Sequence, residues 1–290
     1  MRSFYFNRTA ESARLASDLA SERRRADTTI PGIDFRIAEC DVGKWECLRV
    51  TDEEGARSID RPAGNYDTLS TARMDMLTDE EIYDVQDEVA RKLCEMFDKN
   101  SITPDKILVV GLGNRMLTPD SVGSKAAERV QATMHIREFD EEMFGGLGCS
   151  EIAVITPGVS AQSGLDATEM VKGICRRIIP DAVIAIDAYA ARSQKRLGTT
   201  IQISDTGLCP GSGVGNHRQS LSEATLSTPV IAIGVPTVID SRVFAMGEDF
   251  DGALAGEAML VSPKEIDEIT TVAAKIIGGA INQAFGISPY

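Results

Sequence analysis

The sequence has few of the residues that metal, membrane and secreted proteins depend on. Only two histidines, His135 and His217, occur among its 290 residues, so a histidine-rich metal site is not expected. No run approaches the length of apolar residues that a transmembrane helix needs. The first ten residues lack the apolar centre of a signal peptide. We therefore expect a soluble, cytoplasmic protein with no membrane contact and no bound metal.

The sequence also has few cysteine and aromatic residues, and this limits the compartment and the kind of core. The six cysteines form no C-x-x-C pair, which is typical of reduced thiols in a cytosol-like compartment. Aromatic residues make up 5% of the chain, so the core has to be aliphatic. The formal net charge is −14, and such a surface repels nucleic acid. Neither a nucleic-acid partner nor a cofactor is expected.

What is present is an alternation of strand and helix patterns. Residues 33–51 alternate loosely around a central turn, as in a β-hairpin. Thr78 and Glu81 form a capping box before an amphipathic helix, and Ser262 with Pro263 at the first helical position starts the last one. Buried strands are predicted at 106–111, 151–155, 182–186, 199–204 and 230–234, and helices at 119–134 and 166–179.

Short aliphatic strands separated by helices predict an α/β fold with a mainly parallel sheet covered on both faces. The N-terminal β-hairpin region adds to it. Residues 1 to about 30 are polar and show no clear hydrophobic period, so we expect them to lie outside the core of a single domain.

The stretch "VVGLGNRMLTPDSVG" (109–123) runs from a buried strand through a glycine turn into a helix. A dinucleotide cradle would need a third glycine, but Met116 stands in that position. No Walker-type G-K-[ST] follows either, so nucleotide binding is disfavoured. The turn instead predicts that Asn114 and the Thr118-Pro119-Asp120 corner lie at the carboxyl edge of the sheet, where open α/β sheets bind ligands.

A second acidic residue is predicted at that edge, because the strand at 182–186 ends in Asp187. Two carboxyl groups held close together cannot both ionise easily, so one becomes a general acid and the other a general base. Such a pair can activate water against an amide. A purely structural interpretation stays open: Asp120 can favour a helix dipole, and Asp187 can cap the following helix.

A glycine-rich loop after the strand at 199–204 contains Asp205, Ser212 and His217. It is either a surface loop that needs positive φ angles or a rim that binds an extended peptide through its backbone. His217 is interpreted as a hydrogen-bonding loop residue rather than a metal ligand.

These segments together resemble the germination protease family of spore-forming bacteria, which degrades small acid-soluble spore proteins. The resemblance spans nearly the whole chain and rests on the glycine-turn segment together with "TPGVSAQSG" (156–164), "AIDAYAARS" (185–193), "TTIQISDTG" (199–207), "PGSGVGN" (210–216), "IAIGVPTVID" (231–240) and "SPKEID" (262–267). It implies a three-layer α/β/α core similar to that of hydrogenase-maturation endopeptidases. It also implies an endopeptidase of atypical aspartic type, made as a zymogen and assembled as a tetramer.

The family's two proposed catalytic aspartates fall on Asp120 and Asp187. Asn114, Ser193 and the loop carrying Asp205, Ser212 and His217 are then expected to shape the cleft or to stabilise the oxyanion. The substrates implied are small acid-soluble spore proteins in the forespore or spore core.

The stretch "SDLASE" (17–22) is similar to the acid-then-apolar site that the family cuts in its substrates. It leads to the hypothesis that the chain cuts itself between Asp18 and Leu19, which makes residues 1–18 a propeptide and 19–290 a single endopeptidase domain. The sequence departs from the family at Ser17, where threonine is usual, and at Cys209, where histidine is common. The segment 240–261 is shorter than in long members, which puts the tetramer in doubt.

Two other functions remain open from the residues. The strand-end acids could hold a divalent ion in a metal-assisted, maturation-type peptidase. The chain could also be an inactive relative that binds peptides without cutting them.

Overall fold

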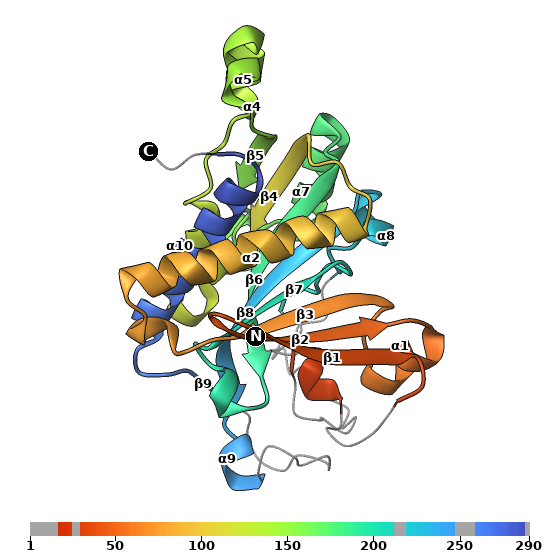
Figure 1. The fold of residues 1–290 in the computed structure, drawn as a ribbon, viewed down its shortest axis with the longest axis vertical. Helices are drawn as coiled ribbons and strands as arrows, with labels where there is room; N and C mark the ends of the chain where they lie inside the picture. The colour runs from red at the N-terminus through yellow and green to blue at the C-terminus, as the bar shows by residue number, and fades with distance from the viewer. Residues whose placement is uncertain (1–16, 25–29, 212–218, 247–258, 288–290) are drawn as a thin grey trace, which may run out of the picture.

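The computed structural model describes residues 17–24, 30–211, 219–246 and 259–287 (Figure 1). Its strands are β1 (Ile33–Cys40), β2 (Gly43–Val50), β3 (Gly64–Ser70), β4 (Lys106–Gly111), β5 (Glu151–Ile155), β6 (Ala182–Ala191), β7 (Thr200–Ser204), β8 (Val230–Asp240) and β9 (Leu260–Val261). Its α-helices are α1 (Glu53–Ile59), α2 (Asp79–Lys99), α3 (Val122–Ala127), α4 (Met134–Phe139), α5 (Glu141–Leu147), α6 (Ser160–Ser163), α7 (Ala167–Ile178), α8 (Glu223–Leu226), α9 (Val243–Met246) and α10 (Ile266–Ala284). Its short 3₁₀ helices are η1 (Ser21–Arg23), η2 (Met74–Met76), η3 (Thr118–Asp120) and η4 (Gln194–Arg196).

The described strands form one mixed sheet in the order β1-β2-β3-β7-β8-β6-β4-β5, with β9 beside β8. Neighbours among β5, β4, β6 and β8 are parallel, as expected for short aliphatic strands joined through helices. From β8 to β7 and on through β3, β2 and β1 the pairing is antiparallel. The predicted α/β class and the N-terminal hairpin are both confirmed.

Both faces of the sheet are covered, which gives three layers. Along β6, Ile184 and Ile186 belong to one apolar cluster, together with residues of α2, α3 and α10. Val183 and Ala185 belong to a second cluster, which includes residues of α7. Because successive strand residues point to opposite faces, α2 and α10 lie on one side of the sheet and α7 on the other. Figure 1 shows α2 crossing in front of the strands.

The capping box before α2 is confirmed. Thr78 accepts the Glu81 N–H at 3.3 Å, and the Glu81 carboxylate accepts the Thr78 N–H at 2.8 Å. On the inward face of α2, apolar side chains at helical spacing contact α10. This pair of long helices closes one face of the sheet.

The helix predicted at 119–134 is broken into η3, α3 and α4, with bonds to other elements in between. The Gln131 N–H is bound by Asn282 of α10 at 2.9 Å, and the Thr133 N–H by the Ile152 carbonyl at 2.9 Å. These tertiary partners replace the helical hydrogen bonds that local sequence favours.

Three further predicted boundaries were wrong. The strand predicted at 182–186 does not end at Asp187, because β6 continues to Ala191 through its pairing with β8. Helix α10 begins after Glu265 rather than with Pro263 at its first position, and its N-cap makes no side-chain bond. Strand β8 continues to Asp240, beyond the predicted end at 234. The extension is paired on both sides, with β6 and with β9, so sheet contacts lengthen a strand that the sequence alone would end at Gly234.

The expectation that the whole N-terminal stretch lies outside the core was also wrong. Leu19 and Ala20 are both 0% exposed. Leu19 belongs to the cluster on the α7 side of the sheet, whereas Ala20 joins a small cluster with Leu48, Val50 and Tyr66. Two adjacent apolar residues that enter separate clusters leave no periodic pattern in the sequence, which explains why their burial was missed. Among the described helices, none has the length and apolar character to cross a membrane.

Candidate active site

The glycine turn after β4 holds Asp120 rather than a phosphate. Gly113 has φ of +91°, and a Cβ there would lie 2.0 Å from the Asp120 carbonyl oxygen, so only glycine fits. The Asn114 N–H donates to Asp120 Oδ2 at 2.8 Å. Asn114 Oδ1 in turn accepts the Met116 N–H at 3.0 Å and Gln162 Nε2 at 2.7 Å. The turn therefore folds back on η3 and fixes its carboxylate.

Asp187 lies at the same edge of the sheet, in the neighbouring strand β6. It is 6% exposed, and its Oδ1 accepts the Ala188 N–H at 2.9 Å. The Leu112 N–H donates to the Ile186 carbonyl at 2.8 Å, which ties the end of β4 to the residue before Asp187. Helix η3 contacts both β6 and β8. The structure thus brings the elements that carry Asp120 and Asp187 together, although Asp187 lies within β6 and not at its end.

A close approach at Gly123 sets how near these elements come. A Cβ on Gly123 would lie 2.2 Å from the Ile186 carbonyl oxygen and 2.5 Å from the Leu112 carbonyl oxygen. The first turn of α3 therefore rests directly on the residue after β4 and on β6 just before Asp187. Any larger residue would push η3, and Asp120 with it, away from Asp187.

Tyr189 extends the site along β6. Its side chain is buried, and the ring occupies the space that a side chain at Gly234 would fill. Burial raises the pKa of the Tyr189 phenol above its usual range, and the nearby carboxylates of Asp18 and Asp187 raise it further. The phenol is therefore neutral at neutral pH.

Residues 17–24 lie along the strand just beyond Asp187. The Asp18 N–H donates to the Ala190 carbonyl at 2.9 Å, and Asp18 Oδ2 accepts the Ala190 N–H at 2.8 Å. Since Asp18 precedes the fully buried Leu19, the bond between them is held against β6 near one of the two predicted acids. This is the bond that the sequence predicted as the self-cleavage site.

The carboxylate of Glu22 anchors the far end of this segment. It accepts the N–H groups of Arg192 at 2.6 Å and Ser193 at 2.8 Å, and the hydroxyl of Ser17 at 2.5 Å. Ser193 also binds the Lys195 N–H through its hydroxyl, at 3.2 Å. Ser193, predicted to shape the cleft, thus contacts the segment through its backbone.

The carbonyl of Ser17 is surrounded by cationic groups. It accepts from Arg61 Nη2 at 2.7 Å and from Arg23 Nε and Nη2 at 3.1 and 3.0 Å. Arg23 also pairs with Asp60 at 2.9 Å. Charge-assisted bonds of this kind are about twice as strong as neutral ones, so they fix the backbone just before Asp18.

One residue at this site was missed by the sequence analysis. Gln202 of β7 is 2% exposed; its Oε1 accepts the Ala20 N–H at 2.9 Å, and its Nε2 lies 3.5 Å from the Asp18 carbonyl oxygen. The available signal was a lone amide between the apolar residues Ile201 and Ile203 of a predicted buried strand. A polar side chain in such a position requires a partner.

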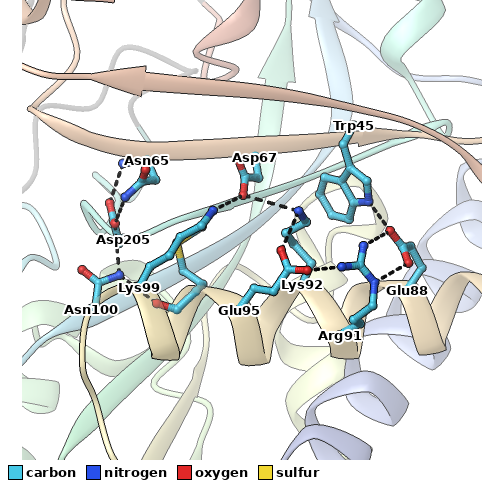
Figure 2. Close-up of polar contacts among 11 residues, drawn as sticks. Trp45, Asn65, Asp67, Glu88, Arg91, Lys92, Glu95, Lys99, Asn100 and Asp205 are labelled. Atoms are coloured by element: carbon cyan, nitrogen blue, oxygen red, sulfur yellow. Dashed lines mark hydrogen bonds and ion pairs between the residues drawn. The ribbon is translucent and has the colours of Figure 1, made fainter. Parts of the chain in front are cut away.

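Asp205 is not brought to the two acids. Figure 2 shows it between β3 and the end of α2, with its carboxylate facing Asn65 and Asn100. Its Oδ1 accepts the Asn65 N–H at 2.7 Å, and its Oδ2 accepts both side-chain amides, at 2.6 and 3.1 Å. These contacts tie β7 to β3 and α2. Ser212 and His217, also predicted at the cleft, lie outside the described residues.

Comparison with known proteins agrees with the resemblance seen in the sequence. The model of the germination protease family matches residues 10–249. The chain belongs to the germination protease family. A germination protease from Caldanaerobacter subterraneus subsp. tengcongensis is 37% identical over 80% of this chain and 71% of its own length. Those from Clostridium perfringens strain SM101 and Priestia megaterium are 33% and 39% identical, covering 92% and 78% of this chain and 94% and 62% of their own.

Membership in this family makes the protein a protease. Among solved structures, a [NiFe] hydrogenase maturation protease, HycI from Thermococcus kodakarensis, matches 66% of this chain and 99% of its own at 18% identity, with a TM-score of 0.38. That likeness is too distant to carry a functional argument. In the part of the chain that the structure describes, no three His, Cys, Asp or Glu side chains cluster so as to hold a metal ion.

Proposed function

We propose that the protein is a self-processing endopeptidase in which Asp120 and Asp187 activate water. The observation that carries this proposal is the position of the bond between Asp18 and Leu19. It is held by Ala190 on the strand that carries Asp187, at the edge where η3 presents Asp120. The segment 17–22 therefore lies where a substrate would lie.

The chemistry follows from two carboxyl groups that share one proton. The ionised aspartate takes a proton from water as the water oxygen bonds to the Asp18 carbonyl carbon. The carbonyl oxygen carries the negative charge of the tetrahedral intermediate. When the carbon–nitrogen bond breaks, the other aspartate gives its proton to the Leu19 nitrogen. The products are a carboxyl group and an amine, and the pair again holds one proton.

The substrates that fit this site resemble the chain's own segment. An acidic residue before the cleaved bond matches Asp18, an apolar residue after it matches buried Leu19, and a later glutamate matches Glu22. We propose small acid-soluble spore proteins as the substrates, in the spore core, with residues 1–18 as a propeptide. We also carry the family's tetramer forward as a proposal, which sedimentation would test.

The decisive test is the mass of the purified chain held at mildly acidic pH. We expect the wild type to lose residues 1–18 and to cut a peptide containing T-E-F-A-S-E after its glutamate. Asp120→Asn and Asp187→Asn should remain intact and cut about 10²–10⁴-fold more slowly, since each removes one of the proton-transfer groups.

The matched control is Asp181→Asn, at the amino end of the same strand. The Asp181 carboxylate accepts the Lys106 N–H at 2.7 Å, at the opposite end of β6 from the proposed site, so this variant should process normally. Processing by Asp120→Asn at the wild-type rate would contradict the mechanism. The same assay in EDTA tests the metal-assisted alternative. If EDTA abolished cleavage and added metal restored it, that alternative would be favoured. An intact wild-type chain that binds the peptide without cutting it would favour the inactive relative.

A further inference from the structure

The amide of Gln202 faces the site from the strand two places away from Asp187. In the register of the sheet, Asp187 pairs with Gly234 and Gly234 pairs with Gln202. Paired residues share a face, and adjacent strands lie about 4.8 Å apart, so Asp187 and Gln202 project from the same face about 10 Å from each other. The ring of Tyr189 lies over the intervening Gly234, and residues 18–20 contact both outer strands, at Ala190 of β6 and at Gln202 of β7.

The side chain of Gln202 contacts the segment 17–24 on both sides of the bond between Asp18 and Leu19. On the far side, Oε1 accepts the Ala20 N–H at 2.9 Å. On the near side, Nε2 points at the Asp18 carbonyl oxygen at 3.5 Å. One amide thus reaches the group before the bond and the group after it.

The orientation of this amide is fixed by its partners. The Ala20 N–H requires an acceptor, so the oxygen of Gln202 has to face Ala20 and the nitrogen has to face the Asp18 carbonyl. The hydroxyl of Thr68, on the adjoining strand β3, lies 3.4 Å from the same oxygen. A flipped amide would set one N–H against another and leave the carbonyl of Asp18 facing an oxygen.

We propose that Gln202 is a catalytic residue that donates its Nε2–H to the carbonyl oxygen of the cleaved bond. This inference rests on the proposed function, in which that bond is the one hydrolysed. As negative charge develops on the oxygen, the oxygen becomes a stronger acceptor and the 3.5 Å contact shortens, as catalytic hydrogen bonds do between ground and transition states. The bond to Ala20 holds the peptide in register while this happens.

Both contacts are to backbone groups, so Gln202 serves any sequence that lies in the site. Selectivity for acidic and apolar side chains then falls to other groups: the bonds from Arg192 and Ser193 to Glu22, and the buried position of Leu19. The proposal therefore separates a residue that serves the chemistry from residues that choose the substrate.

The test is Gln202→Glu, which keeps the shape and the acceptor but loses the donor at neutral pH. We expect kcat on the T-E-F-A-S-E peptide to fall about 10²–10³-fold with little change in KM. The ratio of the variant's kcat to that of the wild type should rise as the pH falls, because a protonated glutamic acid regains an O–H donor. A purely structural role would move KM and stability and leave this ratio flat.

The matched control is Gln86→Glu, since Gln86 contacts Gln283 between α2 and α10, far along the chain from the site. It should leave kcat and its pH dependence unchanged. If the wild type cuts the peptide and Gln202→Glu cuts it equally fast at neutral pH, the role of Gln202 is overturned while the proposed function stands. If the wild type does not cut the peptide at all, the proposed function itself fails.

A second measurement needs no variant, and so it decides the matter even if Gln202→Glu does not fold. In a peptide with lactic acid in place of the alanine of T-E-F-A-S-E, an ester oxygen replaces the N–H that matches Ala20. The wild type should cut it about tenfold less efficiently, the loss of one hydrogen bond. A peptide with the same replacement outside these six residues should be cut normally. Equal cleavage of the alanine and lactic acid peptides would overturn the proposal.

Discussion

The two faces of the sheet are closed in different ways. On one face, α2, α3 and α10 pack an aliphatic cluster against the strands. On the other, residues 17–24 supply part of the cover, held by hydrogen bonds to β6 and β7. Apolar packing that belongs to long helices serves stability. Buried polar groups that face a short segment are a local departure from core patterning, and such departures occur at functional sites.

The buried charges of the two faces differ in the same way. Figure 2 shows Asp67 of β3 facing Lys92 and Lys99 of α2. Asp67 is 2% exposed, and the two nitrogens lie 3.8 and 3.2 Å from its Oδ2. Both lysines belong to α2, so their contacts with Asp67 are lost only when the protein unfolds. On the other face, Ala190 and Gln202 form hydrogen bonds with residues 17–24, the segment whose place we propose a substrate peptide takes.

The largest expected effect compares two leucines that are both 0% exposed, Leu93 on α2 and Leu19 in the segment. Leu93→Ala should lower the free energy of unfolding by about 3–5 kcal/mol through a cavity in the helix-covered face. Leu19→Ala should lower it by less, because the segment can detach while the rest stays folded. Denaturant titration of both variants, each in an Asp120→Asn background that prevents processing, measures the difference. Equal losses would show that the segment is an integral part of the fold.

A smaller effect is expected from Asp67→Asn. It removes a buried carboxylate from Lys99 and from Lys92, although Lys92 keeps its bond to Glu95 at 2.9 Å. We expect a loss of about 2 kcal/mol, the range for hydrogen bonds to charged groups. Peptide cleavage by the remaining folded protein should be unchanged, because the site lies on the opposite face. Denaturant titration measures the loss of stability, and kcat/KM measures peptide cleavage. If cleavage were impaired while the protein stayed folded, the expectation would be wrong and the two faces of the sheet would be energetically coupled.

The smallest effect is a dependence of stability on acid pH at Glu88 of α2. Burial raises the pKa of Glu88, but bonds from Arg91 and from Trp45 at 2.5 Å outweigh it, so the pKa is lowered overall. A lowered folded-state pKa means that the stabilisation is present above the unfolded pKa of about 4.3 and is lost as the pH falls below it. Thermal unfolding of Glu88→Gln between pH 7 and pH 3 should therefore show a shallower acid decline than the wild type. If the unfolding temperatures of Glu88→Gln and of the wild type fell equally with pH, this prediction would be refuted.

Local patterns in the sequence predicted much of the fold. The alternating strands and the capping box of Thr78 are set by neighbouring residues, so the sequence alone predicted them. The strand end predicted at Asp187 was wrong, because pairing with β8 extends β6 to Ala191. The break in the helix predicted at 119–134 depends on Asn282 and Ile152, which are remote in sequence. No local pattern contains that information.

The site was predicted in the same uneven way. Asp120 follows the end of β4, and Asp187 lies on the adjacent parallel strand, one residue beyond the partner of the last β4 residue. Gln202 acquires its role only when β7 pairs antiparallel with β8 and the segment crosses over it. Asp205 looked like part of the cleft because it follows the same strand, but the pleat turns it toward Asn65 and Asn100. The sequence indicates where Gln202 and Asp205 lie along the strand but not the directions in which their side chains point.

The burial of Leu19 has a consequence for how the enzyme would be held in check. Leu19 and Ala20 remain joined to β1 through the chain, so after the proposed cleavage they would still compete with substrate for the same buried position. A competitor tethered to its own site acts at a high effective concentration. Removal of residues 1–18 would then be insufficient for full activity, and the new chain end would have to swing out before a spore protein could enter. Turnover at low substrate would be set by that departure rather than by bond cleavage.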